Sequence, residues 1–239
     1  MKLLPTSYFL LLPMTLDASQ VQAILFDVDG TLADTDDQYI EKAARLIRPM
    51  NFLFPRRDSM PFLRWALMAA EAPINMAVTL PDWLGVDDEI VALMNWWADR
   101  NPNQAAEHFV LMAGVDHMVA RLETRYPLAV VTARSERGVN AFLDQFALGP
   151  HFRAVASAQT APHTKPYPDP VLWAAQTLGV PAANCVMVGD TTVDILTGKR
   201  AGAQTIGVLC GLGERGELEH AGASLILERT ADLADVLLR

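Results

Sequence analysis

Two carboxylates stand close together near the start of the chain, directly after a short apolar run. Residues 23–26 (Ala-Ile-Leu-Phe) are typical of a fully buried strand, and Asp27 and Asp29 follow them. Side chains two residues apart in a strand point to the same side, so both carboxylates can reach one site if the extended backbone continues past residue 26. Gly30 then allows the chain to turn sharply.

The chemistry that this pair of carboxylates suggests is the binding of a cation. Two close carboxylates repel each other and are costly to ionise together unless a cation lies between them. Oxygen ligands of this kind suit Mg2+. The alternative is a solvated acidic turn after a strand, and the Asp-x-Asp-Gly spacing alone does not separate the two interpretations.

Polar residues also follow two other apolar runs, predicted as strands over 127–131 and 184–188. The polar segments after these runs contain Thr132, Ala133, Arg134, Gly189, Asp190, Thr191, Thr192 and Asp194. In a parallel sheet, ligands bind beyond the carboxyl ends of the strands. Three strand ends therefore present carboxylates and a hydroxyl to one crevice, which favours a built site over a solvated turn.

The elements that must position these residues alternate between strand and helix from residue 114 onward. The further strands are predicted over 152–156, 205–208 and 225–227. The helices are predicted over 115–125, 136–146, 168–178, 192–201 and 231–238. Strands joined by helices imply a parallel sheet covered on both faces. The predicted fold class is therefore α/β, with a Rossmann-like parallel sheet flanked by helices.

A segment of different character interrupts this pattern. Residues 34–113 contain several helical patterns, clearest over 60–72 and 87–100, and no convincing strand. The domain organisation predicted is an N-terminal extension over 1–20, core segments over 21–33 and 114–239, and a helical insert over 34–113. Most of the tryptophans fall in the insert, where aromatic residues at helical spacing more often form a core than contact a ligand.

The N-terminal extension has the character of a weak signal peptide, with one lysine before a short apolar run. Pro5 and Pro13 interrupt the run, no Ala-x-Ala cleavage site follows, and the run is too short to span a bilayer as a helix. We expect an irregular tail packed on the core rather than an export signal.

Charge and cysteine content narrow the classes of partner and the compartment. The formal net charge of −9 argues against a nucleic-acid or anionic-membrane partner, but not against a small phosphorylated substrate that needs only a local site. Cys185 and Cys210 form neither a disulfide framework nor a zinc spacing. Cys185 begins an apolar run, which predicts a buried, inert thiol. We therefore expect a cytoplasmic protein, either a monomer or a homodimer.

Four separate motifs occur in the order found in one known family. They are Asp27-Val28-Asp29-Gly30-Thr31-Leu32, Thr132 at the end of an apolar strand, Lys165-Pro166-Tyr167-Pro168-Asp169-Pro170, and Gly189-Asp190-Thr191-Thr192-Val193-Asp194. On these motifs the chain resembles the haloacid dehalogenase (HAD) superfamily, in particular its phosphoglycolate-phosphatase-like branch with a helical cap. The resemblance covers residues 21–238, although the insert matches the cap only in kind and position.

The resemblance implies a Mg2+-dependent hydrolysis of a small phosphomonoester. Asp27 would be the nucleophile that forms an aspartyl-phosphate, and Asp29 would be the general acid and base. The resemblance also implies binding roles for other residues. Phosphate would be bound by Thr132, the amide of Ala133 and Lys165, and Mg2+ by Asp27, the backbone carbonyl of Asp29, and Asp190. Asp194 would bind the metal through water or orient Lys165.

The family's cap closes over the site and reads the leaving group. The insert would do so here, with hinges at Asp34-Thr35 and Met112-Ala113-Gly114. Its candidate specificity residues are Arg64, Trp65, Trp96 and Arg100. Many relatives have glycine or asparagine after the second-motif hydroxyl, whereas this chain has Ala133 and Arg134. We expect Arg134 to be a solvated helix-start residue, with contact to substrate as the alternative.

Three other functions remain as alternatives. A sugar-phosphate phosphomutase shares the cap and the motifs, and would return phosphate to the sugar instead of releasing it. A non-catalytic binding protein on the same fold is disfavoured by the retention of the whole residue set. A dehalogenase is disfavoured by Asp29, since carbon–halogen chemistry needs no such acid. Phosphoglycolate is the substrate that the resemblance suggests.

Overall fold

The computed structural model describes residues 15–34 and 109–239. These residues form a six-stranded, fully parallel sheet with the strand order β3-β2-β1-β4-β5-β6. The strands are β1 (Ala23–Phe26), β2 (Leu128–Val131), β3 (Phe152–Ala156), β4 (Cys185–Gly189), β5 (Gln204–Val208) and β6 (Leu225–Leu227). The predicted α/β class and parallel sheet are confirmed.

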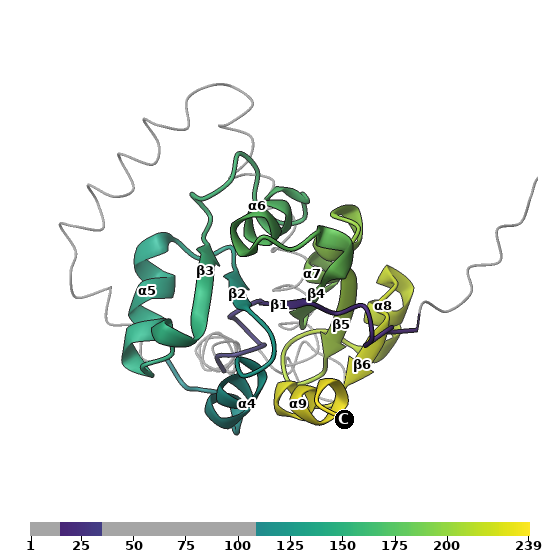
Figure 1. The fold of residues 1–239 in the computed structure, drawn as a ribbon, viewed down its shortest axis with the longest axis horizontal. Coiled ribbons are helices and arrows are strands. Elements are labelled where there is room, and N and C mark those ends of the chain that lie inside the picture. The colour runs from purple at the N-terminus through teal and green to yellow at the C-terminus, as the bar shows by residue number, and fades with distance from the viewer. Residues whose placement is uncertain (1–14, 35–108) are drawn as a thin grey trace, which may run out of the picture.

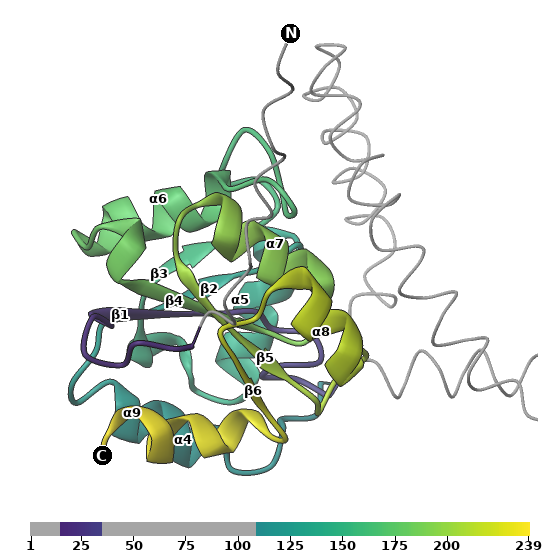
Figure 2. The ribbon, with the colours of Figure 1, turned by 90° about the vertical axis from the view of Figure 1, so that its right-hand side faces the viewer.

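Helices cover both faces of the sheet (Figures 1 and 2). The helices on one face are α4 (Val115–Leu122), α5 (Glu136–Gln145) and α9 (Leu233–Leu237). Those on the other face are α6 (Asp169–Leu178), α7 (Thr192–Arg200) and α8 (Arg215–Ala221). Short 3-10 turns, η4 (Gly149–His151), η5 (Ala182–Asn184) and η6 (Thr230–Asp232), precede β3, β4 and α9.

The two faces of the sheet build two separate hydrophobic clusters. In β1, Ile24 and Phe26 pack with α4, α5 and α9, whereas Ala23 and Leu25 pack with α6. All four side chains are fully buried, which explains why this strand is a continuous apolar run instead of an alternating pattern. The small residues of the second cluster, mostly alanine and valine, let α6 approach the sheet closely.

Element boundaries differ from the sequence prediction mainly at the C-terminal end of the chain. Helix α8 was not predicted, although Gly222 ends it in the left-handed conformation that favours glycine. The helix predicted over 231–238 is divided into η6 and the shorter α9. The helix predicted over 115–125 ends at Leu122, because the chain turns back toward β2 through residues 123–127.

The chain segments at the two ends of the insert lie next to each other. The amide of Asp34 donates to the carbonyl of Val110 at 2.8 Å, and the amide of Met112 donates to the carbonyl of Leu32 at 3.0 Å. Ala33 and Leu111 thus form an antiparallel bridge. Except for these end residues, the predicted helical insert lies outside the described residues, as do Thr35, Arg64, Trp65, Trp96 and Arg100.

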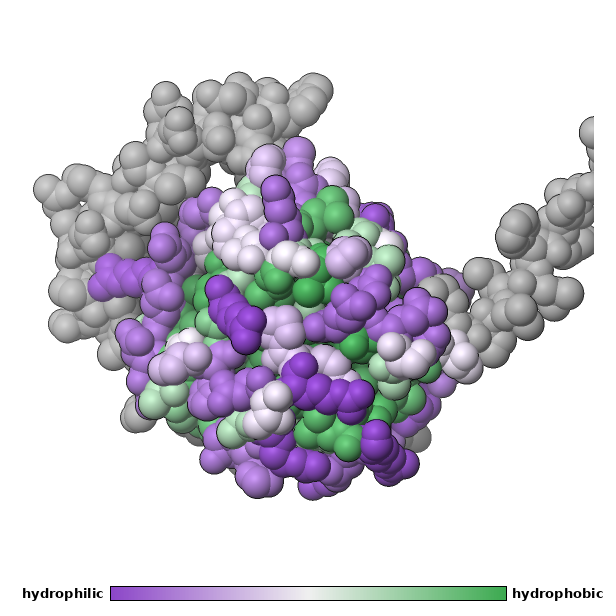
Figure 3. Space-filling view, in the orientation of Figure 1, coloured by the Kyte–Doolittle hydropathy of each residue, from purple (hydrophilic) through white to green (hydrophobic). Residues whose placement is uncertain are grey.

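The described surface is mixed in polarity. Figure 3 shows hydrophilic residues spread among smaller hydrophobic patches over the face that it presents. The large hydrophobic residues exposed in the described ranges are Val110, Tyr167 and Leu172. At the N-terminal side, Leu16 and Ala18 pack against the core. Among residues 15–34 and 109–239, no helix is both long and apolar enough to cross a membrane.

We predict that Cys185 is unreactive in the folded protein. Its side chain is fully buried in β4, and burial raises the pKa of the Cys185 thiol to about 11. Only about one molecule in a thousand would carry the thiolate at about pH 8. Iodoacetamide labelling followed by peptide mass spectrometry should find Cys185 unmodified in native protein and modified in denaturant. Native labelling at the denatured rate would contradict the burial of this thiol.

Candidate active site

The candidate site lies where the strand order changes direction. From β1 the chain adds β2 and β3 on one side, and then crosses to add β4 on the other side. The strand pairings put Phe26 beside Val130 of β2 and Val188 of β4, so the residues that follow all three strands lie at one edge. Parallel sheets bind their ligands at such a switch point, and the predicted site residues gather there.

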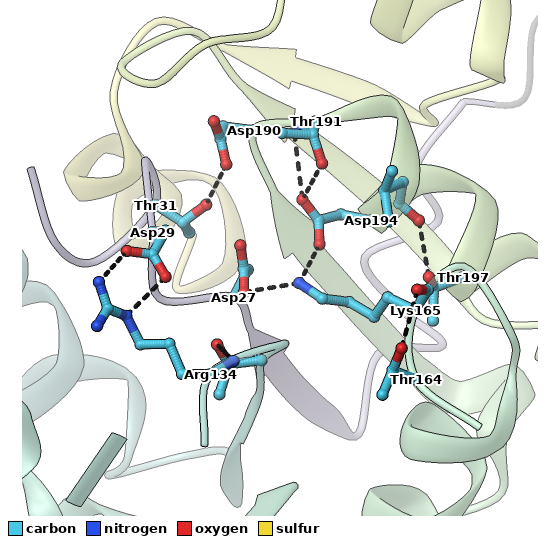
Figure 4. A network of polar contacts seen from close by, with 12 residues as sticks. Asp27, Asp29, Thr31, Arg134, Thr164, Lys165, Asp190, Thr191, Asp194 and Thr197 are labelled. Carbon is cyan, nitrogen blue, oxygen red and sulfur yellow. Dashed lines mark hydrogen bonds and ion pairs between the residues drawn. The ribbon is translucent and has the colours of Figure 1, made fainter. Parts of the chain in front are cut away.

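In the loop after β1, three backbone hydrogen bonds share one carbonyl acceptor. The carbonyl of Val28 accepts hydrogen bonds from the amides of Thr31, Leu32 and Ala33, at 3.3, 2.8 and 2.8 Å. Gly30 adopts φ +69°, which permits the tight turn. The regular strand ends at Phe26, and the carboxylates of Asp27 and Asp29 face different partners (Figure 4). The turn, not continued extended backbone, sets their directions.

A buried lysine joins two of the carboxylates. Nζ of Lys165 lies 2.7 Å from Oδ1 of Asp27 and 2.7 Å from Oδ1 of Asp194 (Figure 4). Burial alone would lower the pKa of Lys165, but the charges of Asp194 and Asp27 raise the pKa above its ordinary value, so the ammonium keeps its proton. Burial raises the pKa of Asp27, opposed by Lys165 and reinforced by Asp194 and Asp29.

The residues around Lys165 fix its position from both sides. Oδ2 of Asp194 accepts hydrogen bonds from the amide and the hydroxyl of Thr191, at 3.2 and 2.8 Å, and so caps the start of α7. At the other end of α7, the guanidinium of Arg200 donates to the carbonyl of Pro166 at 2.8 Å. Helix α7 therefore positions both the loop that carries Lys165 and the carboxylate of Asp194, which pairs with the Lys165 ammonium.

Asp190 is held rigidly by groups that the sequence analysis did not select. Its Oδ1 accepts a hydrogen bond from the hydroxyl of Thr31 at 3.2 Å, and its Oδ2 accepts one from the amide of Leu212 at 2.9 Å. A Cβ at Gly213 would lie 1.9 Å from the carbonyl oxygen of Asp190, so only glycine fits at this point of the loop. A Gly-x-Gly pair after the strand predicted over 205–208 was the available signal for this close approach. The pair does not show that Asp190 is the residue approached, because Asp190 lies far from it along the chain.

The acidic residues suit a hard cation. The carboxylates of Asp27, Asp190 and Asp194 each offer an oxygen within 4.8 Å of the others, and all three residues are buried. Burial, together with repulsion from Asp194 and Asp29, raises the pKa of Asp27. If the three carboxylates are ionised, Lys165 balances only one of their charges, so a divalent cation would offset the remaining repulsion. An all-oxygen set with few carboxylates fits Mg2+. The side chain of Asp29 is not in this group, consistent with the predicted use of its carbonyl.

Thr132 and Arg134 follow β2 at the same edge. The buried hydroxyl of Thr132 accepts a hydrogen bond from the amide of Arg134 at 3.1 Å. The guanidinium of Arg134 binds both oxygens of Asp29, with Nε–Oδ2 at 2.7 Å and Nη2–Oδ1 at 2.5 Å (Figure 4). Only 12% of the Arg134 side chain is exposed, so the expectation of a solvated residue was wrong. No local pattern indicates this pairing, because 105 residues separate the partners.

Comparison with known proteins agrees with this geometry. The family model for haloacid dehalogenase-like hydrolases matches residues 24–208, which include every site residue described above except Leu212 and Gly213. The chain belongs to this hydrolase family.

Individual relatives of this HAD-like hydrolase match over most of its length. It is 28% identical to "Pyrophosphatase PpaX" of Bacillus velezensis over 91% of this chain and 96% of the relative. It is 29% identical to "Probable phosphatase IndB" of Dickeya dadantii, covering 88% and 90% of the two chains. A solved structure of a predicted phosphoglycolate phosphatase from Haemophilus somnus has a TM-score of 0.62 at 19% identity, covering 91% and 98%, which supports the fold.

In this HAD-like hydrolase, the predicted site residues differ in how closely the structure joins them. Asp27, Lys165 and Asp194 are in direct contact, and Asp190 lies beside Asp27 in the acidic group. Asp29, on the loop after β1, lies against Arg134 instead of Lys165 (Figure 4). Ala133 is exposed directly after Thr132 at the end of β2.

Gly213→Ala should destabilise the protein, because the added methyl group collides with the backbone of Asp190. We expect a loss of about 1–3 kcal/mol in the free energy of unfolding, the usual cost of overpacking. Gly216→Ala is the matched control, since a Cβ there meets nothing within 4 Å and the residue lies in α8. Its melting temperature should be equal or higher. Equal melting temperatures for both variants would contradict the close approach at Gly213.

Proposed function

We propose that the protein is a Mg2+-dependent phosphatase that hydrolyses a small phosphomonoester through an aspartyl-phosphate intermediate. The observation that carries the proposal is the buried contact of Asp27 with Lys165, beside Asp190 and at the switch point of the sheet. Membership of the HAD-like hydrolases and the phosphatase names of two relatives support the same class of reaction.

The nucleophile in this proposal is Asp27. A carboxylate oxygen of Asp27 attacks phosphorus, the bond from phosphorus to the leaving oxygen breaks, and an acyl phosphate forms. Water then attacks the same phosphorus, which releases inorganic phosphate and restores the carboxylate. Burial serves this role because a desolvated site limits attack by water on the substrate before the nucleophile reacts.

Asp29 is the proposed proton carrier. It donates a proton to the leaving oxygen in the first step and accepts one from the attacking water in the second. Its carboxylate contacts Arg134, whereas the carboxylate of Asp27 contacts Lys165 (Figure 4). These different partners let one carboxylate act as the nucleophile while the other exchanges protons.

The remaining residues stabilise charge on the phosphoryl group. Lys165 keeps its ammonium next to Asp27 and can contact a phosphate oxygen from this position. Thr132 and the amide of Ala133 would donate hydrogen bonds from the end of β2. Mg2+, held by Asp27, the carbonyl of Asp29, and Asp190, would neutralise phosphate charge and align it for attack. Asp194 would orient Lys165, with which it is in contact.

Two kinds of substrate are suggested for this reaction. The resemblance suggests phosphoglycolate, and the name of one relative points to pyrophosphate. We propose that the insert over 34–113 acts as a cap that selects the leaving group. The antiparallel bridge between Ala33 and Leu111, which joins the two ends of the insert beside the nucleophile loop, supports this placement.

Release of inorganic phosphate from a panel of small phosphate compounds tests the proposed function. We expect release that requires Mg2+ and stops with a chelator. Asp27→Asn should lower turnover by about a thousandfold or more, because the amide is a poor nucleophile. Asp235→Asn, at an exposed carboxylate paired with Arg121, is the control and should keep its activity.

Two results would contradict the phosphatase proposal. Near wild-type turnover by Asp27→Asn with Mg2+ present would remove Asp27 as the nucleophile. Interconversion of sugar phosphates without release of inorganic phosphate would instead identify a phosphomutase.

A further inference from the structure

Asp29, the proposed proton carrier, forms an ion pair with Arg134. Both carboxylate oxygens of Asp29 accept hydrogen bonds from the guanidinium, at 2.7 and 2.5 Å (Figure 4). Such two-point pairing fixes the orientation of a carboxylate. A carboxyl group that carries the proton for the leaving oxygen is neutral, so it cannot stay in a two-point ion pair with a guanidinium. The ion pair therefore has to open during turnover.

The surroundings of Arg134 make this opening costly. Its guanidinium carbon lies 4.9 Å from the centre of the Phe109 ring, and 12% of the side chain is exposed. Phe109 is itself fixed, by an edge contact with Phe142 at 5.6 Å and by a hydrogen bond from the side-chain Nε2 of Gln145 to its carbonyl. The Asp29 side chain is 30% exposed, so the guanidinium is the more buried partner of the pair. A largely desolvated guanidinium that loses its counter-ion is unfavourable.

We propose that Arg134 exchanges Asp29 for a second anionic group of the substrate, which frees Asp29 to carry protons. This inference rests on the proposed function and adds a substrate class to it. The second group is a carboxylate or a phosphate, since a planar guanidinium pairs at two points with either. Arg134 is thus a specificity-determining residue that also positions Asp29.

The second anion must lie close to the reacting phosphate. The amide of Arg134 is bonded at 3.1 Å to the hydroxyl of Thr132, the residue proposed to contact the phosphoryl group. Because the same guanidinium reaches the proposed proton carrier, the substrate atoms between the leaving oxygen and the second anion are few. Phosphoglycolate and pyrophosphate meet this requirement, whereas alkyl phosphates without a second anionic group do not.

Paired substrates test the exchange through turnover. Phosphoglycolate and 2-hydroxyethyl phosphate are similar in size, and only the first has a second anion. We expect wild type to prefer phosphoglycolate in kcat/KM by about tenfold or more, because a buried charged group left unpaired costs at least that factor. Arg134→Gln should remove the preference, lowering kcat/KM for phosphoglycolate and raising it for 2-hydroxyethyl phosphate. Arg134→Lys should restore part of it.

Arg121→Gln is the matched control for this series. Arg121 also pairs with an aspartate, Asp235, at 2.8 Å, but both side chains are exposed and lie on α4 and α9. This variant should keep the wild-type preference. If Arg134→Gln lowers kcat/KM equally for both esters, Arg134 has only a structural role and the proposal is overturned.

A binding measurement separates failure of the inference from failure of the proposed function. Isothermal titration calorimetry with phosphonoacetate and ethylphosphonate compares a phosphonate with and without a second anion, and needs no turnover. We expect wild type and Arg121→Gln to bind phosphonoacetate more tightly, and Arg134→Lys to lose part of the difference. Equal affinities in wild type would overturn the inference even if phosphate is released. Absence of phosphate release with a clear phosphonoacetate preference would overturn the phosphatase proposal alone.

Discussion

The ammonium of Lys165 lies between the carboxylates of Asp27 and Asp194, and all three residues are almost completely removed from water. Taking these charges out of water is costly unless each has a partner at good distance. The partners come from three separate segments, which must reach the same point to within a fraction of an ångström. The pairing register of β1 with β4 and the capping of α7 by Asp194 position these segments so precisely.

The same constraint explains why backbone groups matter as much as side chains at this edge of the sheet. The carbonyl of Val28 accepts hydrogen bonds from three amides, and the amide of Leu212 donates to Asp190. Gly213 has no side chain and so leaves room for the carbonyl of Asp190. Because these contacts are short and buried, the acidic residues are positioned before any ligand arrives. Preorganised groups of this kind lose little energy to rearrangement during a reaction.

Much of the fold and the acidic group could be predicted because their signals are local. Continuous apolar runs identified buried strands, and the strand-end rule brought Asp27, Asp190 and Thr132 to one edge. Helix α8 was missed because its short polar sequence lacks an apolar stripe, and Leu218 is its one buried residue. The roles of Arg134, Thr31 and Leu212 depend on partners 105, 159 and 22 residues away, so no local pattern could reveal them.

The pairing of residues 32–34 with residues 110–112 has a consequence for how such a protein can diversify. Both ends of the insert are fixed side by side by backbone hydrogen bonds, whose formation does not depend on side-chain identity. These hydrogen bonds therefore offset the entropy that is lost when the ends of the insert are brought together. This loss grows only slowly with the length of the intervening chain. Sequence and length between these anchor points can therefore change while the backbone hydrogen bonds beside the catalytic edge stay intact.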